Sequence, residues 1–282
     1  MRTWLPPRLL GLTAATLLVL TAACSGSDAA GDTAGSTAGP APASPTGTGS
    51  PSPPPTADDA PATPSPSTAP SGRGEALPGF PGLQPLWPFA TLAEAGSWER
   101  AFRSDGSQPW HRDPEQTALS FTQGYLGFSG IDRVTSRDVT GREARVGVGP
   151  SGTEGTEGSG TAAVIHLVRY GAGPDAPWEV VGTDEADFSL TSPAYGATVG
   201  TPLRAGGRIT GVDESVRVDV RQPSTEKVLG TTCCLSAGGR NQPWTSTVTF
   251  SGARDPVLTV VASTGGHVAE VERFTVTAVR TR

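Results

Sequence analysis

The C-terminal part of the chain alternates apolar and polar residues with a period of two. In the run 215–221, valine at every second position alternates with Arg217, Asp219 and Arg221. Such alternation is typical of a β-strand with one face in a core and the other in water. Similar strand-like runs recur at 188–191, 204–210, 215–221, 226–232, 245–250, 257–263 and 271–279. Their even spacing predicts an all-β sandwich over residues 186–282.

A helical pattern comes before these strands. Thr91 and Glu94 form a capping-box pattern, and apolar residues follow them at the spacing of one helix face. Asp113 and Pro114 mark a second helix start, with the aspartate as the cap and the proline in the first turn. The period then changes to two at 143–148, 162–170 and 178–183. This order of elements predicts a small α+β domain over residues 86–185.

The N-terminus has the pattern of an export signal. Two arginines precede an uncharged run at 9–23, which is shorter than the about 20 residues of a membrane-spanning helix. The run ends in Leu20-Thr-Ala-Ala-Cys24, which resembles the lipobox of bacterial lipoproteins, with Thr21 where leucine or valine is commoner. The resemblance implies a signal peptide over 1–23 and lipidation of Cys24. The alternative is an ordinary secretory signal that leaves Cys24 as a free thiol.

The next segment has the composition of a disordered linker. Of the 50 residues at 25–74, 45 are Ala, Pro, Gly, Ser or Thr, and none is Val, Ile, Leu, Met or aromatic. Such a segment cannot bury enough apolar surface to offset the entropy of ordering it. We therefore expect a disordered Pro/Ala/Gly/Ser/Thr stalk over residues 24–85, which holds the folded part away from the membrane.

Charge and motif content exclude several classes of function. The formal net charge is −6, which excludes a basic nucleic-acid footprint over the whole molecule, so no nucleic-acid partner is expected. The three histidines lie far apart and lack the spacing of metal ligands, so no metal and no cofactor is expected. The sequence also offers no nucleophile with a base at a recognisable spacing, and no catalytic residue is assigned.

One polar and aromatic cluster is a candidate for ligand binding. Trp110, His111 and Arg112 are consecutive and stand directly before the second helix start. A tryptophan, an imidazole and a guanidinium together could line a ligand groove. The alternative is that they form a helix cap with a packed tryptophan.

Residues 190–203 carry the motif LTSPAYGATVGTPL, and related motifs follow it. They are VRV at 216–218, VLG at 228–230 and WTSTVTF at 244–250. Together they resemble the immunoglobulin-like domain of bacterial spore germination, with a match from Phe188 to Val279. The resemblance implies an immunoglobulin-like β-sandwich, usually carried by exported or lipid-anchored proteins and expected to bind partners. No catalytic residues come with this family.

Cys233 and Cys234 are adjacent in the sequence. In a regular strand their side chains would point to opposite faces, and their Cα atoms, about 3.8 Å apart, are closer than in most disulfides. A bond between them therefore requires a distorted turn, and residues 235–241, with two glycines, supply a loop where it could lie. Because an extracytoplasmic compartment is oxidising, a disulfide between the two is expected. Two thiols or intermolecular bridges are the alternatives.

These features predict a lipid-anchored, extracytoplasmic and non-enzymatic binding or adaptor protein of the cell membrane, which presents an immunoglobulin-like domain. Its partner is expected to be a protein or a cell-wall component, in sporulation, germination or envelope maintenance. The alternatives are a cell-wall-acting enzyme or a small-ligand receptor with its site in residues 86–185. The two folded segments are expected to fold separately, because no pattern crosses the polar junction at 182–187.

Overall fold

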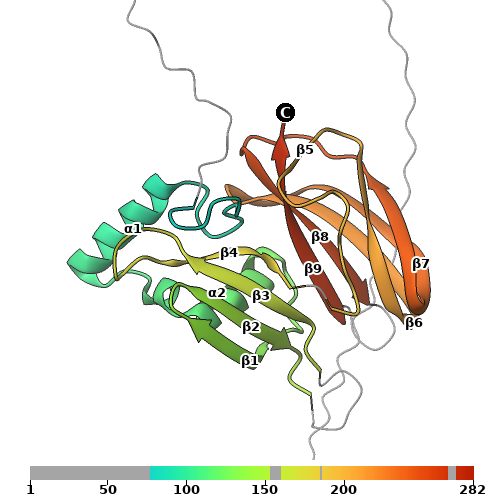
Figure 1. Ribbon diagram of the computed structural model, residues 1–282, viewed down its shortest axis with the longest axis horizontal. Coiled ribbons are helices and arrows are strands. Elements are labelled where there is room, and N and C mark those ends of the chain that lie inside the picture. Colours follow the sequence, from blue (N-terminus) through green and yellow to red (C-terminus); the bar gives the residue numbers. More distant parts are fainter. Residues whose placement is uncertain (1–76, 153–159, 185, 266–270) are drawn as a thin grey trace, which may run out of the picture. The chain divides into compact units, whose positions relative to one another are not determined.

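The computed structural model describes residues 77–152, 160–184, 186–265 and 271–282, without the side chains of residues 212 and 213 (Figure 1). These residues form mostly β-sheet with few helices, and all belong to one unit of the chain, residues 64–282. The expected signal peptide, Cys24 and the linker up to residue 76 lie outside the described residues. Among the helices that are described, none is long and apolar enough to cross a membrane.

The first half of the described chain forms two α-helices and an antiparallel four-stranded sheet. α1 (Leu92–Asp105) begins at the predicted cap, where the backbone N–H of Glu94 donates to Thr91 Oγ1 over 3.2 Å. α2 (Pro114–Ser120) begins after the predicted cap and continues through a π-helical turn, η2 (Phe121–Tyr125). The sheet has the order β1-β2-β3-β4, with β1 (Arg133–Thr140), β2 (Glu143–Gly149), β3 (Ala163–Arg169) and β4 (Trp178–Thr183).

The second half forms a five-stranded sheet with the order β5-β9-β8-β6-β7. Its strands are β5 (Ala197–Val199), β6 (Leu203–Gln222), β7 (Thr225–Val248), β8 (Val257–Gly265) and β9 (Arg273–Thr281). Shifts in the register of β6 against β7 let these two long strands bend. The first part of β6 forms bridges to Phe188 and Ser192, whereas its second part pairs with β8. This arrangement is compatible with a β-sandwich.

One segment that the sequence assigned to a loop lies inside a strand. Residues 235–241 belong to β7, and they continue the pairing with β6. Gly239 and Asn241 have φ values of 107° and 49°, in the region that favours glycine and tolerates asparagine. The glycines that suggested a loop therefore accommodate an irregular backbone within the strand, and the loop expectation is wrong.

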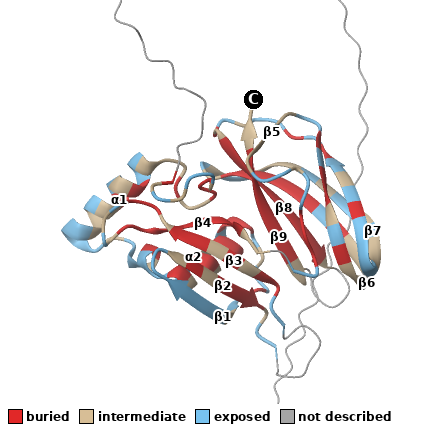
Figure 2. Ribbon diagram, viewed as in Figure 1, coloured by how far each residue is buried: buried red, intermediate tan, exposed pale blue. Residues whose placement is uncertain are grey.

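The two sheets share one hydrophobic core, and the second sheet has a further core of its own. Figure 2 shows buried residues along both sheets, in particular in β3, β4, β8 and β9. One buried cluster combines residues of both: Val146, Ile165, Trp178, Val261 and Phe274. A hydrogen bond joins the same elements, since the backbone N–H of Val276 donates to Thr183 Oγ1 over 2.9 Å. Residues on both sides of the junction at 182–187 therefore stabilise one another.

The packed part of the chain begins before residue 86, where the sequence placed the end of the linker. Leu77 is buried in a cluster with side chains of α1. The backbone N–H of Gln84 donates to the Tyr195 hydroxyl over 2.8 Å, and Gln84 Oε1 accepts from Arg280 Nε over 3.2 Å. Residues 77–85 are thus part of the fold, because their apolar side chains pack against α1. The composition of the segment itself does not indicate this packing.

Candidate functional site

His111, which the sequence grouped with Trp110 and Arg112 in a ligand groove, is a core residue. Its ring centroid lies 4.9 Å from that of Phe89 and 5.1 Å from that of Trp98. Burial lowers the pKa of the His111 imidazole to about 4, so the ring is uncharged at neutral pH. An uncharged, buried ring among aromatic side chains serves packing rather than ligand recognition.

Arg112 and Trp110 have different neighbours, although both lie on the short 3₁₀-helix η1 (Pro109–Arg112). A guanidinium nitrogen of Arg112 lies 3.1 Å from a carboxylate oxygen of Asp175. The Trp110 ring instead stacks on Trp87, with 5.5 Å between the ring centroids. The three residues therefore do not line one groove, and Trp110 alone of them borders a hollow.

That hollow, which we call the aromatic hollow, has a volume of about 690 Å³ and lies between η2 and the turn that joins β6 to β7. Its principal lining side chains are Trp87, Trp110, Gln123, Tyr125, Pro223 and Glu226. The centroids of the Trp87 and Tyr125 rings are 6.1 Å apart. The stacked rings provide a flat apolar wall, and polar side chains stand around it.

A second hollow lies over the polar face of β6, which the sequence expected to meet water. Asp219 and Arg221 are only 7% and 9% exposed on this face. The end of η2 packs on Arg221, since its guanidinium donates to the carbonyl oxygens of Tyr125 over 2.6 Å and of Leu126 over 3.1 Å. The expectation of a solvated face is therefore wrong at these two positions, and at Arg221 the reason is a distant segment that packs across the strand.

We call this second hollow the disulfide groove. It has a volume of about 610 Å³. Its principal lining residues are Leu126, Phe128, Arg217, Asp219, Arg221, Val228, Thr231, Cys233, Cys234, Ser263 and Val271. Charged side chains of β6 thus share the groove with apolar side chains of the neighbouring segments. Pockets that combine apolar walls with a few polar groups are the usual form of a ligand site.

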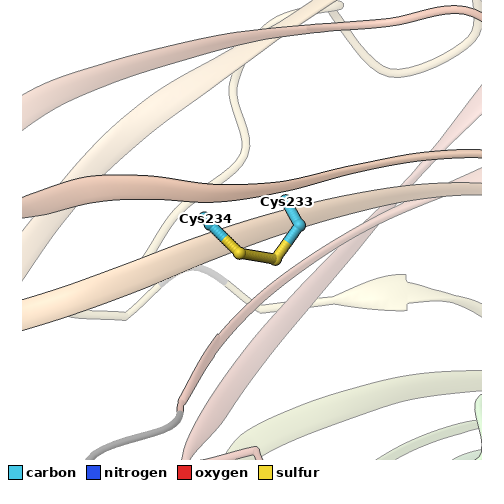
Figure 3. The surroundings of a disulfide bond; sticks show 2 residues. All are labelled: Cys233 and Cys234. Carbon is cyan, nitrogen blue, oxygen red and sulfur yellow. A yellow bond between two sulfur atoms is a disulfide. The ribbon is translucent and has the colours of Figure 1, made fainter.

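Cys233 and Cys234 are joined by a disulfide (Figure 3). Both residues line the groove. Val216 pairs with Leu235 and Val218 with Thr232, so the two cysteines together stand opposite a single residue of β6. This is a β-bulge, in which the alternation of side-chain directions is broken. Cys234 has a φ of 70°, which is the local distortion that a bond between adjacent cysteines requires. The bond therefore lies in a strand rather than in a loop.

Two charged groups in the groove each have one buried atom without a hydrogen-bond partner. Asp219 Oδ1 accepts no hydrogen bond, and Arg221 Nε donates none, within the part of the chain that the structure describes. Neither group forms an ion pair there. Buried polar atoms in folded proteins are almost always hydrogen-bonded, and leaving them unpaired is costly. The groove is therefore the strongest candidate site in the described structure.

Sequence reasoning missed this groove, although one signal for it was present. Arg217, Asp219 and Arg221 repeat at every second residue opposite three valines. That pattern is typical of a solvated strand face, and nothing near it in the sequence indicates the cover by residues 126–128. Among the described residues, no group of three or more histidine, cysteine, aspartate or glutamate side chains could hold a metal ion.

A further buried titratable group lies outside both hollows. Glu179 on β4 is 0% exposed, and its Oε2 accepts a hydrogen bond from the backbone N–H of Phe89 over 3.1 Å. Its Oε1 has no hydrogen-bond partner among the described residues. Burial raises the pKa of the Glu179 carboxyl well above its usual value of 4.5, although the backbone N–H of Phe89 acts in the opposite direction.

Glu179→Gln is expected to make the protein more stable than the wild type, by an amount that grows as the pH rises. In the wild type, the pKa of Glu179 is higher in the folded state than in the unfolded state. The stability that this group contributes is therefore complete below the unfolded-state pKa, and it is lost as the pH rises toward the folded-state pKa. The amide carries no charge to desolvate, so the variant should gain on the wild type by up to about 1.4 kcal/mol per pH unit above about pH 4.5. Thermal unfolding of both proteins between about pH 4 and about pH 8 measures this gain. The exposed Glu226→Gln is the matched control, and a stability difference that does not change with pH would contradict the assignment.

Comparison with protein-family models and with curated sequences identifies no relative. No protein-family model matches the chain. No curated protein sequence matches it significantly. The resemblance to the germination-associated immunoglobulin-like domain therefore rests on the motifs between residues 190 and 250 alone.

Proposed function

We propose that the chain is a lipid-anchored, extracytoplasmic binding protein of the cell membrane. The uncharged run at 9–23 and the small residues before Cys24 support export and lipidation. The disulfide between Cys233 and Cys234 supports the same location, since disulfides persist in oxidising compartments outside the cytoplasm. The composition of residues 25–74 supports a stalk between the anchor and the folded part.

The C-terminal part, residues 186–282, is proposed to be an immunoglobulin-like domain of the spore-germination type. The motif at 190–203 and the antiparallel pairing of β6, β7, β8 and β9 support this assignment. The proposed partner is a protein or a cell-wall component, in sporulation, germination or envelope maintenance. Such a partner is within reach of a protein that a stalk holds above the membrane.

The disulfide groove carries the proposal that the protein binds a ligand. Its floor holds a carboxylate and a guanidinium that are buried and incompletely paired, and a ligand in the groove would supply the missing donor and acceptor. Asp219 is the only carboxylate among the described lining residues. Paired-carboxylate hydrolysis requires two such groups, so the described lining favours binding over turnover.

A small-ligand receptor with its site in residues 86–185 is the second candidate function. The aromatic hollow supports it, because Trp87, Trp110 and Tyr125 all belong to that part of the chain. Stacked tryptophan rings offer a large rigid contact area at low entropic cost. Loss of binding in Trp110→Ala, with binding retained in groove variants, would favour this candidate over the groove.

Soluble cell-wall fragments are the test ligand for the proposed function. The full-length protein in detergent should bind them saturably, and Asp219→Asn should weaken binding about tenfold or more, because it removes a buried charge from the groove. Asp138→Asn, the same change on the exposed strand β1, is the control and should bind as wild type does. Mass spectra of the fragments should stay unchanged after incubation. Cleaved fragments, or equal binding by both variants, would contradict the proposal.

A further inference from the structure

We propose that the disulfide groove binds a short peptide with both ends free, with the peptide's ammonium group at Asp219 and its carboxylate at Arg217. This inference rests on the proposed function, because it names the ligand class of the same groove. It follows from the charges that the groove presents, from their spacing and from the apolar walls around them.

Asp219 requires a positively charged or hydrogen-bond-donating partner. Its side chain is 7% exposed, and its Oδ1 has no hydrogen-bond partner in the described structure. Arg221, two residues further along the same face, donates from both terminal nitrogens to the carbonyl oxygens of Tyr125 and Leu126, so only its Nε is left without a partner. A carboxylate that is buried without a partner is strongly disfavoured, whereas one that meets a cation is not. A ligand ammonium group satisfies this requirement.

Arg217 provides the complementary charge. It lies two residues before Asp219 on the same face of β6, opposite the two bonded cysteines. Its side chain is exposed and makes no hydrogen bond or ion pair within the described ranges of the chain. A guanidinium group matches the geometry of a carboxylate and can donate two parallel hydrogen bonds to it. Beside the Arg221 guanidinium, which is held by backbone carbonyl oxygens, the groove therefore presents one anion and one exposed cation that have no partner among the described residues.

The backbone positions of the two charged residues are spaced more like the two ends of a dipeptide than those of a single amino acid. Residues two apart on one strand face are separated by about 6.6 Å. The terminal nitrogen and the terminal carboxyl carbon of an extended dipeptide are about 6 Å apart, given about 3.8 Å between its Cα atoms. The ammonium nitrogen and the carboxyl carbon of a free amino acid flank one Cα atom and are only about 2.5 Å apart.

The walls favour small apolar side chains on the peptide. Phe128, Val271 and the bonded cysteines border the groove beside the two charges. An uncharged saccharide could donate hydroxyl groups to Asp219, but it would leave both charges without a counter-charge in a partly desolvated site. Charge complementarity therefore selects the zwitterion.

Alanyl-alanine is the probe that tests this assignment by isothermal titration calorimetry on the full-length protein in detergent at about pH 7, where both of its ends are charged. N-acetyl-alanyl-alanine lacks the ammonium group, alanyl-alanine amide lacks the carboxylate, and N-acetylglucosamine lacks both charges. We expect alanyl-alanine to bind, and each capped derivative to bind about tenfold or more weakly.

Two variants locate the two ends of the peptide. In Asp219→Asn, alanyl-alanine and its N-acetyl derivative should bind equally weakly, because the ammonium group has lost its partner. In Arg217→Met, alanyl-alanine should bind no more tightly than its amide. Arg204→Met, an exposed arginine on the first part of β6, is the matched control and should retain wild-type binding. Because Arg217 is exposed, its variant remains informative even if Asp219→Asn disturbs folding.

The outcomes separate this inference from the proposed function. Equal affinity for the free and the capped dipeptides would overturn the zwitterion. Binding of N-acetylglucosamine but not of alanyl-alanine, lost in Asp219→Asn, would also overturn it while leaving the groove as a binding site. If alanyl-alanine fails to bind while cell-wall fragments bind in a manner that depends on Asp219, the ligand class is wrong and the proposed function stands. If neither binds, both are wrong.

Discussion

Replacing Cys24 with serine is expected to move the protein from the membrane fraction to the medium, or to leave it as an uncleaved precursor. The expected anchor is a lipid on the Cys24 sulfur, and two or three acyl chains at about 0.8 kcal/mol per buried CH₂ hold a protein stably. Serine has no sulfur to accept the lipid. Membrane fractionation, with the mass of the mature N-terminus, measures the change.

Ser25→Ala, next to the same position, is the matched control and should stay in the membrane fraction. Two results would contradict the lipoprotein assignment. One is a Cys24→Ser protein that partitions as wild type does, and the other is a mature wild-type N-terminus at a residue other than Cys24.

Phe274→Ala is expected to lower the free energy of unfolding of the whole described fold by about 3–5 kcal/mol. Phe274 on β9 is 3% exposed, and its ring centroid lies 5.2 Å from that of Phe128 in the other half of the chain. It belongs to the cluster that both sheets share, so the alanine leaves a cavity between them. Denaturant unfolding should show one transition, shifted by the same amount for both halves.

One tryptophan allows this shared shift to be followed. Trp244 is buried in the second sheet and is the one tryptophan of residues 186–282, since the others all come earlier in the sequence. The fluorescence of Trp244→Phe therefore reports on the first half, and its difference from the signal of the protein that retains Trp244 reports on the second. Phe80→Ala, at a half-buried ring, is the control and should cost less. Two separate transitions, of which only the C-terminal one moves in Phe274→Ala, would show that the halves do not depend on a common core.

Local patterns were sufficient to predict the elements that local interactions determine. The caps at Thr91 and Asp113 follow from side chains that satisfy backbone N–H groups within three residues. The strands β2, β3 and β4 could be predicted because their apolar residues, which are buried in the core, give a recognisable pattern. By contrast, β1 escaped prediction because its side chains are mostly exposed and give no apolar period.

The candidate site depends on contacts between distant segments, and this is why the sequence did not reveal it. Arg221 reaches carbonyl oxygens about a hundred positions earlier in the chain, at Tyr125 and Leu126. The bond between Cys233 and Cys234 was among the expected alternatives, but its place in a β-bulge depends on the register of β6 against β7. The cluster proposed at Trp110, His111 and Arg112 does not form one site. His111 is buried in the core, whereas Trp110 lies beside the aromatic hollow.

Amide hydrogen exchange of the full-length protein, with and without soluble cell-wall fragments, tests the central claim that the disulfide groove is the binding site. The segment at 126–128 and the bulge at 231–235 border the groove, and β7 is the outermost strand of its sheet, so these amides should exchange measurably in the free protein. The account predicts that the fragments slow exchange at these two segments and leave residues 87 and 110 unchanged. Slower exchange confined to the aromatic hollow, or no change at the groove at a saturating fragment concentration, would contradict it.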